Sequence, residues 1–296
     1  EIAFFENRGN LRIINLATRQ IRTVMDGKFV FSYSDGDIDF QWSPDSRWLL
    51  TSYIGDGGYH HTDIALIDAS GKEKPFNLTN SGYNDNNGKW VIGGKAMLFR
   101  SNRWGYKNHG GHGSENDYFL MFFDIDAYER FLMTKEEKEI YDKNLADKKK
   151  ADSDAPLTFD LANCQKRVVR ITPNSSRLGD AVLTAKGDTL YYLAAFEGGY
   201  DLWRRNLLED KTEIVLKDVG GGSLSTDSKM KELYLTARRG GIKKIELAKG
   251  KPSNIDYEAV FNYRPYEERK NLYEHIWRQV KDKFYVENLH NVDWEG

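Results

Sequence analysis

Apolar residues occur along the chain in short runs, and a turn-forming segment precedes each run. The segment Trp42–Ser52 opens with Trp-Ser-Pro-Asp-Ser and continues into an apolar run. Pro and Asp supply the backbone angles and side-chain hydrogen bonds of a tight turn, and an apolar run of this length suits a β-strand. Asp63–Asp68 predicts a second strand and Pro75–Thr79 a third. One unit is therefore turn, strand, loop, strand, turn and strand.

The same order of elements returns further along the chain. The later copies are Trp90–Ser101 with Tyr118–Asp124, then Leu183–Leu193 with Tyr200–Asn206 and Thr212–Leu216, then Ser225–Leu235 with Gly241–Leu247. Trp42 and Trp90 lie 48 residues apart (90 − 42), and Leu183 and Ser225 lie 42 apart (225 − 183). A period of about 40–50 residues is typical of β-propellers with four-stranded blades. We therefore predict an all-β fold, a β-propeller.

The apolar run after each turn does not alternate between apolar and polar residues. We interpret it as the inner strand of its blade, buried on both faces between neighbouring blades. A blade cannot bury both faces alone, so stacked blades must supply the core. A β-sandwich also has many short strands, but it does not account for the recurring order of turns and strands.

The first copy is incomplete. Residues 1–27 contain only the later strands of a blade, at Ile2–Phe5, Leu11–Leu16 and Ile21–Val24. About five blades are therefore expected here, whereas closed propellers hold about four to eight. Since the sequence also begins without Met or a leader, we expect it to be part of a longer polypeptide whose preceding blades lie upstream.

One interval is about twice the period, because Trp90 and Leu183 lie 93 residues apart (183 − 90). The excess, about 126–156, predicts a helical hairpin inserted in one blade. Its expected apolar face consists of Tyr128, Phe131 and Leu132, and Thr134 with Glu137 resembles a capping box. The charged run Lys135–Lys150 predicts a solvated face, with docking in an assembly as the alternative. The blade is expected to resume at Leu157–Leu161 and Arg167–Thr172.

The pattern changes after Pro265. Leu272, Ile276, Val280 and Phe284 fall four residues apart, which predicts an amphipathic helix. We therefore place the propeller at residues 1–264 and the start of a second, helical domain at 265–296.

Composition excludes several classes of protein. The 43 Lys and Arg residues nearly balance 45 Asp and Glu, for a formal charge of −2, which argues against a nucleic-acid-binding protein. No apolar run approaches the roughly 20 residues of a membrane helix. The single cysteine, Cys164, excludes an internal disulfide.

The sequence contains no recognisable catalytic motif. A Ser nucleophile elbow requires Gly-x-Ser-x-Gly, and the segments around Ser114 and Ser223 lack the second glycine. The run Gly220–Gly222 precedes a predicted strand rather than a helix, so it predicts a turn and not a phosphate loop. We expect no catalytic residue and no cofactor in this chain.

Two segments carry candidate binding residues. In Asn108–Asp117, two imidazoles and two carboxylates lie on one glycine-rich loop, which either holds a metal or, as we favour, is a structural or channel-lining loop. A basic cluster at Arg238–Arg239 and Lys243–Lys244 either faces the anionic end of a peptide or points outward from a strand end. The candidates for a substrate channel are Arg103, His109, His112, Arg238 and Arg239.

These residues resemble a known family. The repeats with Trp42-Ser-Pro-Asp-Ser46 are similar to the TolB-type propeller repeat. The ending Leu272–Trp294, a Trp-containing helix followed by Phe-Tyr and Val-Asp-Trp, resembles the opening of the helical core of tricorn-type serine peptidases. Three further stretches resemble bacterial tricorn homologues: Gly110–Asp117, Phe122–Tyr128 and Thr172–Ala181.

The resemblance implies a multidomain serine peptidase whose propeller admits peptides or unfolded polypeptides to a separate active site. It implies PDZ and catalytic domains in the same chain, a homo-oligomer and a cytoplasmic location, with an exported one left open. The family's catalytic residues find no match here: His290 falls in a structural motif, and Asn291 stands where the family tends to have Gly. Two alternatives stay open, a non-enzymatic protein- or glycan-binding propeller and the propeller of a prolyl-oligopeptidase-like enzyme.

Overall fold

The computed structural model describes residues 1–32, 36–55, 61–108, 113–146, 156–238, 241–247 and 250–295. It divides into two compact units, Glu1–Ile255 and Asp256–Gly296. The boundary predicted at residue 264 stays a prediction, since the second unit includes the irregular residues that precede the helix. No helix among the described residues is both long and apolar enough to cross a membrane.

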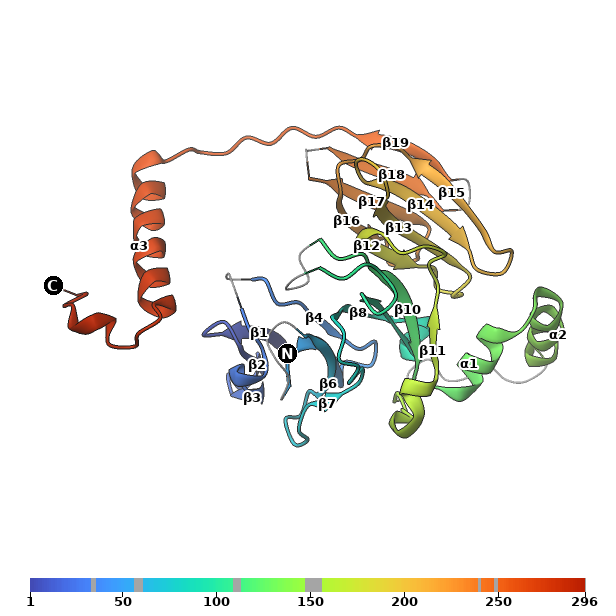
Figure 1. Ribbon diagram of the computed structural model, residues 1–296, viewed down its shortest axis with the longest axis horizontal. Helices are drawn as coiled ribbons and strands as arrows, with labels where there is room; N and C mark the ends of the chain where they lie inside the picture. The colour runs from blue at the N-terminus through green and yellow to red at the C-terminus, as the bar shows by residue number, and fades with distance from the viewer. Residues whose placement is uncertain are drawn as a thin grey trace. The chain divides into compact units, whose positions relative to one another are not determined.

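The first unit contains five antiparallel sheets, and the strands of each sheet pair in chain order (Figure 1). We call these sheets blades 1 to 5. Blade 1 has three strands and the others have four: β1 (Ile2–Glu6), β2 (Asn10–Ile14) and β3 (Ile21–Met25); β4 (Phe40–Trp42), β5 (Trp48–Tyr53), β6 (Asp63–Asp68) and β7 (Phe76–Asn77); β8 (Asp85–Val91), β9 (Ala96–Ser101), β10 (Asp117–Phe122) and β11 (Val168–Arg170); β12 (Arg177–Leu183), β13 (Thr189–Ala195), β14 (Asp201–Asn206) and β15 (Lys211–Leu216); β16 (Gly222–Thr226), β17 (Glu232–Ala237), β18 (Ile242–Glu246) and β19 (Lys251–Ile255). The predicted five blades, the first incomplete, are confirmed.

Each of four apolar clusters joins two successive blades. Strand β9 shows how, because side chains alternate between the two faces of a strand. Its residues Ala96 and Leu98 pack with blade 4, whereas Met97 and Phe99 pack with blade 2. All four are buried. Burial on both faces therefore explains the unbroken apolar run.

The predicted position of that run within the blade is wrong. Strands β5, β9, β13 and β17 follow the turns and lie second in their sheets. The edge strands β4, β8, β12 and β16 precede the turns, and they line a shared cavity described below. These first strands lack a continuous apolar run, because polar residues or glycines interrupt each of them, so the hydrophobic pattern alone does not detect them.

The helical insertion is confirmed as α1 (Ile125–Leu132) and α2 (Lys135–Ala146), which leave blade 3 between β10 and β11. The Phe131 ring packs on Phe122 with centroids 5.1 Å apart. The capping box is confirmed too: the amide of Thr134 donates to the Glu137 carboxylate at 2.8 Å, and the amide of Glu137 donates to Thr134 Oγ1 at 3.3 Å.

The expectation of a strand at Leu157–Leu161 is wrong. Residues 157–160 form no regular element, and a 3₁₀ helix, η4 (Leu161–Lys166), follows. Phe159 instead stacks on Trp90, with ring centroids 5.8 Å apart, and meets Trp48 edge-on at 5.3 Å. Aromatic contacts thus hold this segment in place. Strand β11, which follows η4, is three residues long. The part of this unit that the structure describes also contains the 3₁₀ helices η1 (Gly27–Phe29) and η2 (Ile92–Gly94).

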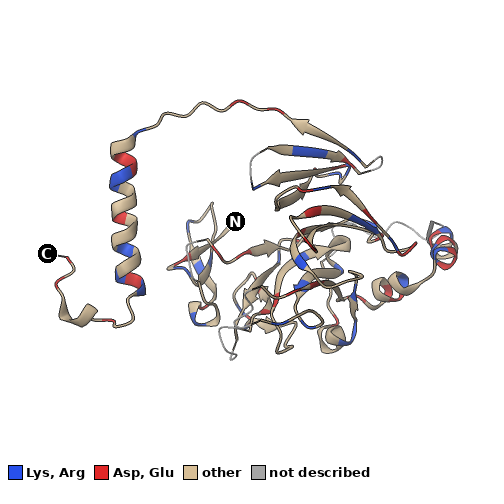
Figure 2. Cartoon of the chain, turned by 45° about the horizontal axis from the view of Figure 1, so that its top comes forward, with Lys and Arg blue, Asp and Glu red and all other residues tan. Residues whose placement is uncertain are grey.

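The second unit consists of α3 (Pro265–Lys283) and a 3₁₀ turn, η5 (Leu289–Asn291). Charges of both signs are spread along α3 (Figure 2). The end of the chain folds back on this helix: Trp277 stacks on Trp294 at 6.2 Å, and its indole N–H donates to the carbonyl of Trp294 at 3.2 Å. Asn291 has φ +61°, a left-handed conformation that Asn tolerates better than most residues. The backbone at this position therefore suits Asn as well as the Gly that the resemblance leads us to expect.

Candidate functional site

The first strands of blades 2 to 5 line one cavity of about 620 Å³. Successive blades contribute corresponding segments to its wall: Asp39–Gln41, Asn87–Lys89, Leu178–Asp180 and Gly221–Ser223. Because each blade places its first strand at the same side of the stack, the cavity follows from the repeat itself.

Glycines let these first strands lie close to the second strands. A Cβ atom on Gly179 would lie 2.8 Å from Leu193 Cβ, and one on Gly222 would lie 2.2 Å from the carbonyl oxygen of Thr236. The strand register also shifts between Leu178 and Ala181. Glycine is therefore required at these two positions, where the first strand approaches the second closely.

Polar contacts join the first strands of neighbouring blades. Lys89 Nζ of blade 3 pairs with Asp180 Oδ1 of blade 4 and donates to the carbonyl of Ala181 at 2.9 Å. The second carboxylate oxygen of Asp180 accepts the amide of Leu224 in blade 5 at 2.8 Å. Asp180 therefore ties three blades together at the cavity wall.

The same wall binds the guanidinium of Arg100. Its Nε donates to Asn86 Oδ1 at 2.8 Å, and its Nη1 donates to the carbonyl of Leu178 at 3.1 Å. The charged side chains here are thus held in place by neighbouring blades. The cavity is polar and charged with both signs, with fixed hydrogen-bonding groups.

Of the five predicted channel residues, Arg238 lines the cavity. It follows β17, its side chain is exposed, and its amide donates to the carbonyl of Gly221 at 3.2 Å. His109, His112 and Arg239 lie outside the described residues. A role in substrate binding stays a prediction for all of them.

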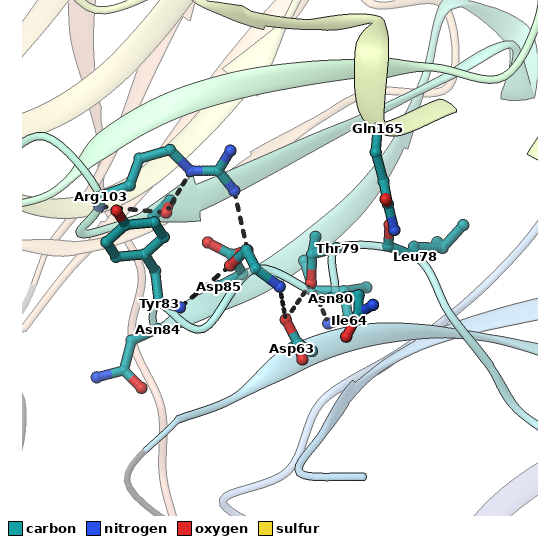
Figure 3. Close-up of polar contacts among 12 residues, drawn as sticks. Asp63, Ile64, Leu78, Thr79, Asn80, Tyr83, Asn84, Asp85, Arg103 and Gln165 are labelled. Carbon is teal, nitrogen blue, oxygen red and sulfur yellow. Dashed lines mark hydrogen bonds and ion pairs between the residues drawn. The ribbon is translucent and has the colours of Figure 1, made fainter. Parts of the chain in front are cut away.

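Arg103 does not line this cavity; it lies in a polar network between blades 2 and 3 (Figure 3). Its Nη2 pairs with the buried carboxylate of Asp85 at 3.0 Å, and its Nε donates to Ser101 Oγ at 3.0 Å. The guanidinium also lies 4.9 Å from the ring centroid of Phe119. These contacts anchor the loop that begins here.

A repeated polar contact was missed by the sequence analysis. The next-to-last strands of blades 1 to 4, which are β2, β6, β10 and β14, each begin with Asn or Asp, at Asn10, Asp63, Asp117 and Asp201. Each side chain accepts a hydrogen bond from the segment that leads out of its blade; the donors are the amide of Gly27, Thr79 Oγ1, Thr172 Oγ1 and the amide of Asp218. Figure 3 includes the Asp63 contact with Thr79. In blade 5 the strand begins with Ile242.

The signal for this contact was present in the sequence. In blades 2 and 4 a second Asn or Asp lies five positions after the first, at the end of the same strand: Asp63 with Asp68 and Asp201 with Asn206. This second side chain caps the following turn: Asp68 accepts the amide of Ser70 at 2.9 Å, and Asn206 accepts that of Leu208 at 2.9 Å. A search for paired Asn or Asp residues would have found the contact in these two blades, but not in blade 3, where Phe122 stands five positions after Asp117.

The metal-binding alternative is not supported within the described part of the chain, where no group of three or more His, Cys, Asp or Glu side chains is placed to hold an ion. The loop histidines His109 and His112 lie outside that part. Ser114 Oγ accepts a hydrogen bond from the amide of Asn108 at 3.1 Å, a loop contact.

The fold is a β-propeller, and the comparisons with known proteins agree with it. Residues 265–296 match the family model described as the Tricorn protease C1 domain. No curated protein matches the chain. A solved tricorn protease aligns with a TM-score of 0.65 and 14% identity over 96% of this chain and 28% of its own.

Two other solved structures share the propeller. TolB from Acinetobacter baumannii aligns with a TM-score of 0.54 and 16% identity, over 86% of this chain and 51% of its own. A puromycin hydrolase aligns with a TM-score of 0.52 and 13% identity, over 85% of this chain and 36% of its own. At these identities the likeness shows the fold alone. Together with the family match, it confirms the predicted resemblance to tricorn-type proteins, of which this chain spans a little over a quarter.

Proposed function

We propose that blades 1 to 5 form the substrate-admitting propeller of a tricorn-like serine peptidase whose catalytic residues lie outside this chain. The cavity at the first strands is the passage, and peptides or unfolded polypeptides pass through it. The observation that carries the proposal is that four successive blades contribute corresponding segments to one polar cavity, followed in the chain by a segment that matches the Tricorn protease C1 domain.

The chemistry of the wall supports an extended peptide as the substrate. An extended chain exposes unpaired backbone donors and acceptors along its length. The wall offers both kinds of group, because Lys89, Asp180 and Arg100 are fixed there by contacts between blades. In a folded domain the backbone donors and acceptors are already paired with one another. Such a domain is also far too large to enter a cavity of about 620 Å³. Selection by width therefore favours unfolded chains.

Narrowing the cavity tests this route in the complete peptidase. Ser223 lies in the wall, and Ser223→Trp places a large ring in the passage. We expect kcat/KM for an unfolded polypeptide to fall at least about tenfold, about 1.4 kcal/mol in activation free energy, while cleavage of a tripeptide amide changes little. Peptidase assays with substrates of increasing length measure this.

The matched control is Ser253→Trp, which adds the same ring to the exposed outer strand β19 of the same blade. Both variants are first compared by thermal unfolding. If Ser223→Trp cleaves long and short substrates as the unmodified protein does, the cavity is not the passage.

The similarity to TolB and to a puromycin hydrolase supports the two alternatives, a binding propeller and a prolyl-oligopeptidase-like propeller. The match at residues 265–296 favours the tricorn-like proposal over both. Reading the parent gene downstream of this segment separates them: a PDZ domain with a tricorn-type catalytic domain supports our proposal, and an α/β-hydrolase with Gly-x-Ser-x-Gly contradicts it.

A further inference from the structure

A second cavity, of about 670 Å³, lies on the flank of blade 4, and it shares no residue with the first. Strands β13, β14 and β15 and the residues directly beside them supply most of its wall, and the segment after β11 supplies Pro173 and Asn174. The wall residues on the sheet are Tyr192, Trp203, Arg205 and Thr212.

These side chains lie on one face of the sheet. Tyr192 pairs across the strands with Trp203, and Arg205 pairs with Thr212; directly opposite residues share a face, as do residues two apart. Phe196 extends the aromatic surface, with its ring edge-on to Trp203 at 5.4 Å and 44% of its surface exposed. An aromatic platform therefore lies at the cavity.

Three polar atoms of this wall have no hydrogen-bond partner among the described residues: Tyr192 Oη, Trp203 Nε1 and Arg205 Nε. All three are buried, and each can donate a hydrogen bond. A buried donor without a partner is unfavourable and gains free energy when an acceptor arrives. Burial also raises the pKa of the Tyr192 hydroxyl to about 12, so the hydroxyl keeps its proton at neutral pH and remains a donor.

The charge of the wall is already balanced. Arg205 pairs with Asp210, and its Nη1 donates to Thr212 Oγ1 at 2.9 Å. The wall therefore favours a neutral ligand with acceptor atoms rather than an anion.

We propose that this cavity, the blade-4 flank site, binds a proline-rich peptide segment in an extended polyproline II conformation. Such a segment presents carbonyl acceptors, while its proline nitrogens carry no donor that would need an acceptor from the wall. Proline rings pack on aromatic surfaces, and aromatic-lined grooves recognise polyproline II helices in this way. A sugar ring would stack equally well, but its hydroxyl groups bring donors that also need acceptors.

The three residues line the cavity, but their donor atoms are buried. Binding at this site therefore requires neighbouring side chains to shift when the ligand arrives, and Phe196, at 44% exposure, is the most exposed aromatic side chain of the platform.

The test titrates the protein with decaproline, with a Gly-Ser peptide of equal length and with maltotriose, using calorimetry. We expect saturable binding of decaproline, with the other two probes at least about tenfold weaker, as one or two lost contacts would cause. Trp203→Phe keeps a ring but removes one donor, and it should weaken decaproline binding about fivefold. Trp277→Phe, in the second unit, is the matched control and should leave the affinity unchanged.

Tyr192→Phe separates binding from folding. Because the hydroxyl lacks a partner in the free protein, removing it should leave the midpoint of thermal unfolding unchanged or raise it, while decaproline binding weakens about fivefold. Preferred binding of maltotriose, absence of decaproline binding, or unaltered affinity in both variants would each overturn the proposal. Tyr192 does not line the first cavity, so Tyr192→Phe should leave the rate of peptide cleavage by the complete peptidase unchanged. The decaproline titration and the cleavage assay therefore test the flank site and the passage separately.

Discussion

At the scale of single residues, buried carboxylates hold the blades in their order. Asp117 has no exposed surface, and its carboxylate accepts hydrogen bonds from Arg170 at 2.8 Å, Thr172 at 2.8 Å and Ser175 at 2.7 Å. The three donors lie in β11 and in the segment that leads to blade 4. One side chain thus fixes the path of the chain between two blades.

Asp117→Ala should lower the free energy of unfolding by about 3 kcal/mol, because it leaves a buried network without its acceptor. Asp201→Ala, at the same position of blade 4, removes an acceptor whose contact is the amide of Asp218 at 2.8 Å and should cost about 1 kcal/mol. Urea denaturation of both variants measures the difference. If both variants lose the same free energy of unfolding, the additional hydrogen bonds to Asp117 contribute no stability beyond that of a single hydrogen bond.

Prediction from the sequence was least successful for individual side chains. Arg103 and Arg238 both follow second strands and look equivalent in the sequence, yet Arg238 lines the cavity and Arg103 pairs with Asp85. The partner of Arg103 comes from the first strand of its blade, 18 residues earlier. Spacing within one strand contains no information about such a partner, so the difference could not be predicted.

At the scale of elements, local patterns were predicted well and long-range ones were not. The apolar runs of β9 and β13 and the capping box of α2 depend on neighbouring residues, and the sequence predicted them. The first strands lack such a pattern: β8 reads Asp-Asn-Asn-Gly-Lys-Trp-Val. Apart from Arg238, the cavity wall was not predicted, because it forms only when blades stack. Phe159 likewise finds its aromatic partners in other parts of the chain.

The first strands should be intolerant of added side chains where they meet the second strands. Gly222 has φ +147°, and a Cβ atom there would lie 2.2 Å from the carbonyl oxygen of Thr236. Gly222→Ala should therefore reduce the free energy of unfolding by about 2–4 kcal/mol, through backbone strain and a steric clash.

Gly198→Ala is the matched control, since a Cβ atom added at Gly198 would have no neighbouring atom within 4 Å among the described residues. It should change stability by less than about 1 kcal/mol in either direction. Chemical denaturation compares the two variants. A Gly222→Ala protein as stable as the control would show that the two strands can separate without cost.

At the scale of the whole first unit, stability should vary from blade to blade. Each interior blade takes part in two apolar clusters, whereas blades 1 and 5 each take part in one. Blade 5 shows the consequence: Leu233 and Leu235 are buried against blade 4, and the opposite face carries Tyr234 and the ion pair of Glu232 with Lys244 at 3.0 Å. In a stack of repeats, stability is approximately a sum of the units and their interfaces.

In this 296-residue chain, backbone amides should exchange more slowly in blades that share an apolar cluster with two neighbours than in blades that share one with a single neighbour. Amides of β9, β10 and β13 should exchange slowest, because their strands are covered on both faces, and amides of β2 and β17 should exchange faster. Mass spectrometry of peptic peptides resolves these strands, and α2, an exposed helix with few packed residues, provides a fast-exchanging internal reference. Uniform protection across the five blades would require them to unfold as one cooperative unit. Greatest protection in blade 1 or 5 would contradict the idea that the interfaces between blades stabilise the unit. The cavity at the first strands depends on the same interfaces.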